Sequence, residues 1–268
     1  MLCLEPLSTP LARRQTATLR NVRPVPPFWE VRFDVEQTPR AGEYLLADLG
    51  GPVRETLFPA TTSGDGFETA VPPGHSALRL LPGATVDVLG PLGRGFRLSP
   101  GGHSIARLLL VAGAEFLPLL GPLFQAAPSV VLVLEAATRA QLPSPQRFPP
   151  SLELTLVTRD GSAGYLGPLE AEGSTPAGLE RAYDRLCELI AWAERICVAH
   201  DPVRYPALAT IIQRVRLHPH SDLAQAIVQV PMPCGSGVCD VCRVTTRHGE
   251  KRACVDGPVF DLLDFLPL

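Results

Sequence analysis

The C-terminal part of the chain reads Pro233-Cys234-Gly235-Ser236-Gly237-Val238-Cys239-Asp240-Val241-Cys242, and Cys254 follows after eleven further residues. The resulting C-x4-C-x2-C…C spacing is typical of the loop that holds a 2Fe–2S cluster in plant-type ferredoxins. Four thiolates must converge on two irons, so three of them come from one tight loop. The spacing therefore predicts a 2Fe–2S cluster held by Cys234, Cys239, Cys242 and Cys254, and a chain that moves electrons rather than making or breaking substrate bonds itself.

The glycines of this loop fit the same interpretation. Gly235 and Gly237 permit left-handed or strained backbone angles, so that backbone N–H groups can point at the sulfurs and stabilise the negative charge of the cluster. A structural zinc site is the alternative, but its four cysteines usually form two C-x2–4-C pairs. The other cysteines, Cys3, Cys187 and Cys197, are expected to be ordinary small core or surface residues.

Composition bounds the class of protein. The chain has 268 residues, enough for two compact domains or for one domain with an appendage. Apolar residues make up 46%, which argues against disorder. The formal net charge of −3 gives no electrostatic case for nucleic acid as a partner.

Neither a membrane span nor a secretion signal is predicted. The most apolar stretch, 108–124, contains Glu115, Pro118 and Pro122 and is short of a bilayer crossing. The first 14 residues lack the basic start and continuous apolar core of a signal peptide. An odd number of cysteines, four of them crowded near the C-terminus, does not fit a secreted disulfide framework. We therefore expect a cytoplasmic protein, or the soluble face of an assembly.

The pattern of the chain predicts three parts. In residues 1–100, short strands separated by Pro/Gly turns predict an N-terminal β-barrel or sandwich, with strands at 16–20, 29–35, 43–48, 78–81 and 85–89. In residues 101–228, strands alternate with helices and predict an α/β domain with a parallel sheet. Its strands are expected at 106–111, 130–135, 152–158, 196–199 and 226–230, and its helices at 117–126, 179–194 and 206–215. Residues 229–268 form a cysteine-rich module too small for a core of its own.

Three motifs in this order carry a resemblance to a known family. They are Gly90-Pro91-Leu92-Gly93-Arg94-Gly95-Phe96, Thr158-Arg159-Asp160-Gly161-Ser162-Ala163-Gly164, and the tail Cys254-Val255-Asp256-Gly257-Pro258-Val259-Phe260. With the cysteine loop, they resemble the electron-transfer subunit of dihydroorotate dehydrogenase B, a branch of the ferredoxin–NADP reductase superfamily.

The resemblance implies a role for each part. Residues 1–100 correspond to a flavin-binding β-barrel, 101–228 to a nucleotide-binding-type α/β domain, and 229–268 to the 2Fe–2S module. It also implies a protein redox partner, a flavoprotein such as a dihydroorotate dehydrogenase-like subunit. The cluster would pass electrons between the flavin of that partner and the FAD of this chain.

The flavin motif departs from the family pattern of Arg-Pro-Tyr/Phe-Ser. The corresponding stretch is Arg54-Glu55-Thr56-Leu57-Phe58-Pro59-Ala60, in which Pro59 stands at the serine and Thr56 at the arginine. Arg54, in a shifted register, and Phe58, in place of the aromatic ring, are the candidate FAD contacts. Glu55 opposes a pyrophosphate, so the sequence leaves FAD binding open.

The nicotinamide motifs depart further. The family has a glycine-rich turn after the first α/β strand, where backbone approaches a dinucleotide at a helix N-terminus. This chain has Ala112-Gly113-Ala114-Glu115-Phe116-Leu117-Pro118 instead. The charge of Glu115 would repel a phosphate by roughly 1 kcal/mol even in a water-like dielectric. The Cys-Gly-Pro of the family appears as His200-Asp201-Pro202, so the sequence predicts weak or absent NAD(P) binding.

Two hypotheses follow. In the first, the chain is an iron–sulfur electron-transfer subunit of a larger oxidoreductase, which relays electrons between the redox centre of a partner and FAD or another acceptor. In the second, it is a degenerate paralogue that keeps the cluster but binds no nucleotide, and it acts as a wiring or assembly subunit of a complex. The order of the three parts favours the first hypothesis, whereas the residues at the nucleotide motifs favour the second.

Overall fold

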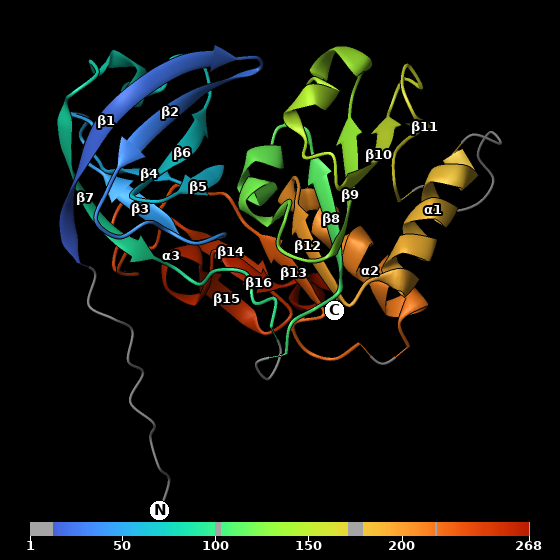
Figure 1. The fold of residues 1–268 in the computed structure, drawn as a ribbon. Coiled ribbons are helices and arrows are strands. Elements are labelled where there is room, and N and C mark those ends of the chain that lie inside the picture. The colour runs from blue at the N-terminus through green and yellow to red at the C-terminus, as the bar shows by residue number, and fades with distance from the viewer. Residues whose placement is uncertain (1–12, 100–102, 171–178, 218, 268) are drawn as a thin grey trace, which may run out of the picture.

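The computed structural model describes residues 13–99, 103–170, 179–217 and 219–267. Two seven-stranded sheets stand side by side, and the C-terminal segment runs from the second sheet to a position beneath the first (Figure 1). Of the sequence-based predictions, the one on Cys3 and the ends of several predicted segments lie outside the described residues. No helix in the described ranges is long and apolar enough to cross a membrane.

The first sheet is antiparallel and follows the order β4-β3-β7-β1-β2-β6-β5. Apolar side chains from both halves of the sheet form its core, including Leu19, Phe33 and Phe67. The strands are β1 (Arg14–Val25), β2 (Phe28–Asp34), β3 (Tyr44–Ala47), β4 (Glu55–Leu57), β5 (Thr61–Ser63), β6 (Gly66–Val71) and β7 (Thr85–Leu92).

A closed barrel is not confirmed. β4 and β5 lie at opposite edges of the sheet, yet only residues 58–60 connect them, so the sheet must curl until its edges approach each other. The ladder still does not close among the described residues, and Pro59 in the connection has no N–H to donate.

The prediction of a strand at 78–81 is wrong. Residues Ser76–Arg79 form the 3-10 helix η1, in which the His75 ring accepts a hydrogen bond from the backbone N–H of Ala77 at 3.2 Å.

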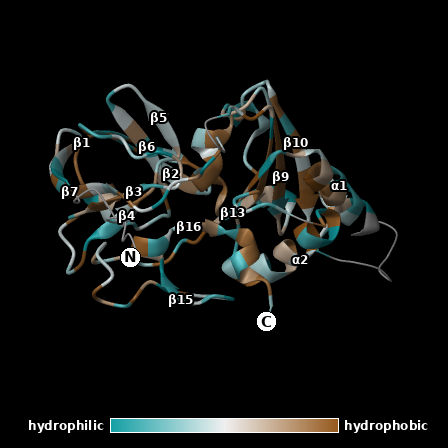
Figure 2. Cartoon of the chain, turned by 90° about the horizontal axis from the view of Figure 1, so that it is seen from below, coloured by the Kyte–Doolittle hydropathy of each residue, from teal (hydrophilic) through white to brown (hydrophobic). Residues whose placement is uncertain are grey.

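The second sheet follows the order β11-β10-β9-β8-β12-β13-β16. Its first six strands are parallel, and β16 joins antiparallel to β13. Hydrophobic residues gather along these strands, as β9 shows in Figure 2, because both faces are covered. The strands are β8 (Arg107–Gly113), β9 (Ser129–Ala136), β10 (Leu152–Thr158), β11 (Tyr165–Leu166), β12 (Arg195–Ala199), β13 (Ala224–Ile227) and β16 (Val259–Asp261).

Two α-helices belong to this sheet, α1 (Leu179–Trp192) and α2 (Tyr205–Val215). The helix predicted at 117–126 is instead the 3-10 helix η3 (Leu117–Leu123). Pro122 inside it lacks a backbone N–H, and a Cβ at Gly121 would lie 2.0 Å from the Ala60 carbonyl oxygen. η3, which follows β8 of the second sheet, therefore packs against the connection between β4 and β5 of the first sheet. Short 3-10 turns also lie at η4 (Arg139–Gln141), η5 (Pro145–Arg147) and η6 (Pro202–Arg204).

The C-terminal segment has no separate core, as the sequence predicts. After β13, the chain forms the cysteine loop, the hairpin β14 (Arg243–Thr246) and β15 (Gly249–Arg252), and the short helix α3 (Ala253–Asp256). It then returns to the second sheet as β16 and ends in η7 (Leu262–Phe265). Cys242, Cys254 and Phe260 belong to the hydrophobic core that also contains the second sheet. The larger sheets thus hold the cysteine loop in place.

Candidate iron–sulfur centre and adjoining cavities

The four predicted ligands come together as two pairs of free thiols. The sulfurs of Cys234 and Cys239 lie 3.2 Å apart, and those of Cys242 and Cys254 lie 3.3 Å apart. Across the described residues, no group of three or more His, Cys, Asp or Glu side chains converges on one position as the ligands of a single ion. Two pairs are the arrangement that two irons require, because each iron of a 2Fe–2S cluster takes two cysteine thiolates. The donor set therefore fits the cluster.

Left-handed backbone shapes the loop at three positions. Gly235 has φ +63° and Gly237 has φ +78°, and Asp240 adopts φ +60° without being glycine. A Cβ at Gly235 would lie 2.7 Å from Leu46 of β3, so the loop packs tightly onto the first sheet. The Asp240 carboxylate accepts hydrogen bonds from Arg252 at 2.8 Å and pairs with Arg243 at 2.9 Å. These two ion pairs tie the loop to the hairpin that follows it.

The two cysteine pairs differ in exposure. Cys239 is exposed and Cys234 is partly buried, whereas Cys242 and Cys254 are buried. Burial raises the pKa of the Cys254 thiol to about 12, and the neighbouring Cys242 adds to the effect. At Cys234 burial acts in the same direction, but hydrogen bonds from the backbone N–H groups of Ser236 and Cys239 outweigh it and lower the pKa to about 6. The loop therefore already directs N–H groups at a ligand sulfur, which a thiolate–iron centre requires.

One cavity adjoins this centre and contains both candidate flavin residues. Its volume is about 560 Å³, and it lies between β4, β6 and the segment 229–233 that leads into the cysteine loop. Arg54 and Phe58 both line it. The Phe58 ring packs against Tyr44, with the centroids 5.6 Å apart, and Tyr44 contacts the core that includes the inner cysteines. The sequence offered no signal for Tyr44 beyond its place in a predicted strand.

The charges in this cavity are mostly paired. Arg54 donates from Nη2 to Asp87 at 2.7 Å, while its Nη1 is buried without a partner among the described residues. Glu55 lies 3.2 Å from His75, whose pKa is lowered by burial although Glu55 opposes that shift. The unpartnered Arg54 N–H and the aromatic Phe58 fit the phosphate and the ring of a flavin. The Glu55 carboxylate is held away by its own partner.

The position where related folds bind a dinucleotide is filled by side chains of this chain. In open α/β sheets, ligands bind beyond the carboxyl ends of the parallel strands. Here β8 ends at Gly113, and a Cβ at that position would lie 3.2 Å from the His200 ring. Phe116 stacks on the same ring, with the centroids 6.4 Å apart. Little room is left for backbone to approach a pyrophosphate.

A network of ion pairs fills the neighbouring strand end. Glu135, the buried penultimate residue of β9, accepts from Arg159 at 2.9 Å and from Arg204 at 3.2 Å, and Arg204 also pairs with Glu170. His200 lies 3.9 Å from Glu135, yet its pKa is lowered because burial outweighs that attraction. A dinucleotide would have to displace these pairs, so the arrangement does not fit NAD(P).

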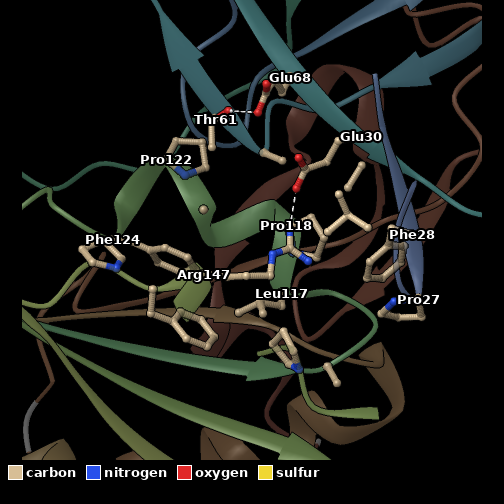
Figure 3. A pocket seen from close by; sticks show the side chains of 18 of the residues that line it. Pro27, Phe28, Glu30, Thr61, Glu68, Leu117, Pro118, Pro122, Phe124 and Arg147 are labelled. Carbon is tan, nitrogen blue, oxygen red and sulfur yellow. Dashed lines mark hydrogen bonds and ion pairs between the residues drawn. The ribbon is translucent and has the colours of Figure 1, made fainter. Parts of the chain in front are cut away.

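A second cavity of about 710 Å³ lies between the two sheets (Figure 3). Phe28, Pro118 and Phe124 form apolar parts of its wall. Its four charged lining residues pair with one another: Glu30 binds Arg147 across the cavity and also Arg23, which in turn reaches Glu68. These pairs link the first sheet to the loop before β10 and leave no free charge in the wall for a cofactor.

The cysteine module has a recognised counterpart. Residues 231–265 match the family described as the iron–sulfur cluster binding domain of dihydroorotate dehydrogenase B. The chain is 31% identical over 175 residues to the electron transfer subunit homolog of dihydroorotate dehydrogenase B from Thermotoga maritima, covering 65% of this chain and 56% of that protein. It is 28% identical over 185 residues to the corresponding subunit from Desulforamulus reducens, covering 67% and 64%. The chain therefore spans less than two thirds of either relative.

Solved structures share the fold over most of the chain. A structure described as an NADH-dependent reduced ferredoxin-NADP oxidoreductase, studied for flavin-based electron bifurcation, superposes with a TM-score of 0.70 at 22% identity, covering 92% of this chain and 88% of its own. The cytochrome P450 reductase GcoB from Amycolatopsis gives a TM-score of 0.59 at 21% identity, covering 80% and 69%.

The fold and the cysteine loop together define an iron–sulfur protein with a ferredoxin reductase-like fold. Within that class, the resemblance to the electron-transfer subunit of dihydroorotate dehydrogenase B is confirmed by the matched cluster domain and by both curated relatives.

Proposed function

We propose that this chain is an iron–sulfur electron-transfer subunit of a larger oxidoreductase, relaying electrons between the redox centre of a partner and FAD or another acceptor. The observation that carries the proposal is the placement of the two cysteine pairs. One pair reaches the surface at Cys239, and the other is buried in the core. A centre built on both pairs has an outer side open to a partner and an inner side embedded in the core of the chain.

The residues around such a centre would have different roles. Cys234 and Cys239 would hold the outer iron, and Cys242 and Cys254 the inner one. The bound cluster supplies a one-electron relay. Gly235 and Gly237 give the loop its shape, and the Asp240 pairs with Arg243 and Arg252 hold it in register.

The 560 Å³ cavity is the proposed flavin site. Its support is the unpartnered Nη1 of Arg54 and the Phe58 ring, which leads through Tyr44 toward the inner cysteines. On this proposal, residues 1–100 form the flavin-binding part, 101–228 the nucleotide-binding-type part, and 229–268 the cluster module. The comparison structures support the arrangement of the fold but not the ligand.

The proposed partner is a flavoprotein such as a dihydroorotate dehydrogenase-like subunit, since both curated relatives are described as electron transfer subunits of that enzyme. The surface around the outer cysteine pair supports a protein partner. Val238 is 81% exposed, and Val241 and Val255 on the same module are also exposed. Exposed large apolar residues gathered at one place are typical of an interaction site.

The second hypothesis, a subunit without any nucleotide, draws support from one end of the second sheet only. His200, Phe116 and the Glu135 network occupy the dinucleotide position, but the flavin cavity is open. We therefore propose a relay that has kept its cluster and its flavin cavity and lost direct reaction with NAD(P)H.

Cofactor analysis of the purified full chain tests the proposal. We expect brown protein with about two irons and two acid-labile sulfides per chain, and FAD released on denaturation. A colourless protein with stoichiometric zinc would overturn the proposal. A cluster without any flavin would support the wiring-subunit hypothesis instead, and reconstitution with FAD would then separate a lost flavin from a site that cannot bind it.

A further inference from the structure

Tyr44, the first residue of β3, carries a buried hydroxyl group that lacks a partner. The side chain is fully buried, and its Oη has no hydrogen-bond partner among the described residues. A buried hydroxyl left unpaired loses its hydrogen bonds to water and gains nothing in return. Such groups are rare in folded proteins, and each points to a group not yet accounted for.

The surroundings of Tyr44 are those of the cysteine centre. β3 supports the cysteine loop, since a Cβ at Gly235 would meet Leu46, two residues from Tyr44, and Leu92, the β7 partner of Tyr44. On another side, a Cβ at Gly93 would lie 2.9 Å from the Tyr44 ring and 2.5 Å from Pro258 of the C-terminal tail. The ring is therefore fixed in place by tight contacts.

Three of the cysteine ligands lie at the buried core that contains Tyr44. Tyr44, Cys242 and Cys254 are buried in one hydrophobic cluster, and Cys234 packs against it. A phenol carries its proton at neutral pH, whereas a thiolate or a sulfide has no proton to donate, so the hydroxyl is the donor toward these sulfurs. The flavin cavity does not provide the acceptor, because Tyr44 is not among the residues that line it, whereas Phe58 is.

We propose that the Tyr44 hydroxyl donates a hydrogen bond to a sulfur of the cluster, either a bridging sulfide or a ligating thiolate, and thereby raises its reduction potential. The inference rests on the proposed function, since it requires the cluster. Reduction adds an electron to a centre that is already negative, and a donor to its sulfurs stabilises the reduced form more than the oxidised one. Tyr44 then contacts the cluster and sets its potential without being one of its ligands.

The test is a redox titration of the full chain. The electron paramagnetic resonance signal of the reduced cluster is measured at each potential. In Tyr44→Phe, which keeps the ring and removes only the oxygen, we expect the midpoint potential to fall by about 59 mV, the one-electron equivalent of a tenfold change in the equilibrium. The matched control is Tyr205→Phe. Tyr205 is equally buried, but its hydroxyl donates to backbone carbonyls at His200 and Ile227, so its loss should leave the potential unchanged.

A Tyr44→Phe protein that keeps its cluster and its potential overturns the inference and leaves the proposed function standing. A wild-type chain that holds no cluster overturns the proposed function itself. If Tyr44→Phe fails to fold, fluorotyrosine incorporated at position 44 alone replaces it. The more acidic phenol is the better donor and should raise the potential, and an unchanged potential would again contradict the hydrogen bond.

Discussion

Cys239 is the exposed member of the outer cysteine pair, and its sulfur lies 3.2 Å from that of Cys234. Cys187 lies on α1, in a different part of the fold. The C-x4-C-x2-C spacing includes Cys239 but not Cys187, and the structure places Cys239, but not Cys187, in the cysteine loop. The contrast makes them a matched pair for testing which thiols hold iron.

We expect Cys239→Ser to lose most of the bound iron and sulfide, because a soft thiolate ligates these irons better than oxygen does. Cys187→Ser should retain the full cluster. Iron and sulfide content, with the visible absorption of the cluster, measures both variants. Equal cluster loss in the two would show that the ligands are misassigned.

At the scale of single elements, the shape of the cysteine loop depends on its glycines. Gly237 has φ +78°, and a Cβ there would lie 2.9 Å from Val255, next to the ligand Cys254. Gly74, in the turn before η1, has a similar φ of +86° but nothing within 4 Å of the same position. An alanine costs about 1 kcal/mol of backbone strain at either site, but only at Gly237 does it also push on the cluster loop.

Gly237→Ala should therefore bind the cluster less stably, and Gly74→Ala should lose only a similar increment of thermal stability. The rate of iron loss to a chelator, measured beside the melting temperature, separates the two effects. Equal rates of iron loss in both variants would mean that strain in general, and not contact with the cluster loop, governs retention.

At the scale of the whole molecule, side chains cover the carboxyl ends of two strands of the second sheet, β8 and β9. His200 and Phe116 cover the end of β8, and Glu135 holds Arg159 and Arg204 at the end of β9. In open α/β sheets, dinucleotides bind beyond these strand ends, so we expect the closure to hinder NADH and NADPH.

We expect the chain alone to bind NADH and NADPH with dissociation constants weaker than about a millimolar, or about −4 kcal/mol. Calorimetric titration of the purified chain with each reduced nucleotide measures it. A constant of about 10 micromolar or tighter, near −7 kcal/mol, would contradict the prediction and make the chain a conventional reductase despite its altered turn.

The sequence by itself determined the local chemistry. The C-x4-C-x2-C spacing and the glycines between the cysteines predicted a site that the structure folds into two thiol pairs, because one tight loop supplies three of the thiols and Cys254 follows in the short helix α3. Continuous apolar runs likewise indicated the strands that pair as β8 and β9, and a more alternating pattern indicated β10. Both features depend on neighbours in the chain, and local patterns record them well.

Only the tertiary structure decided what depends on distant contacts. The stretch 117–126 looks helical by its spacing, but Gly121 against Ala60 and Pro122 within the turn make it the 3-10 helix η3. The Tyr44 hydroxyl, buried without a partner among the described residues, has no signature in the strand that carries it. Distant contacts also fill the dinucleotide position. Gly113 and His200 meet only because β8 and β12 are adjacent in the sheet. These contacts join residues tens of positions apart, and no local pattern specifies which of them will meet.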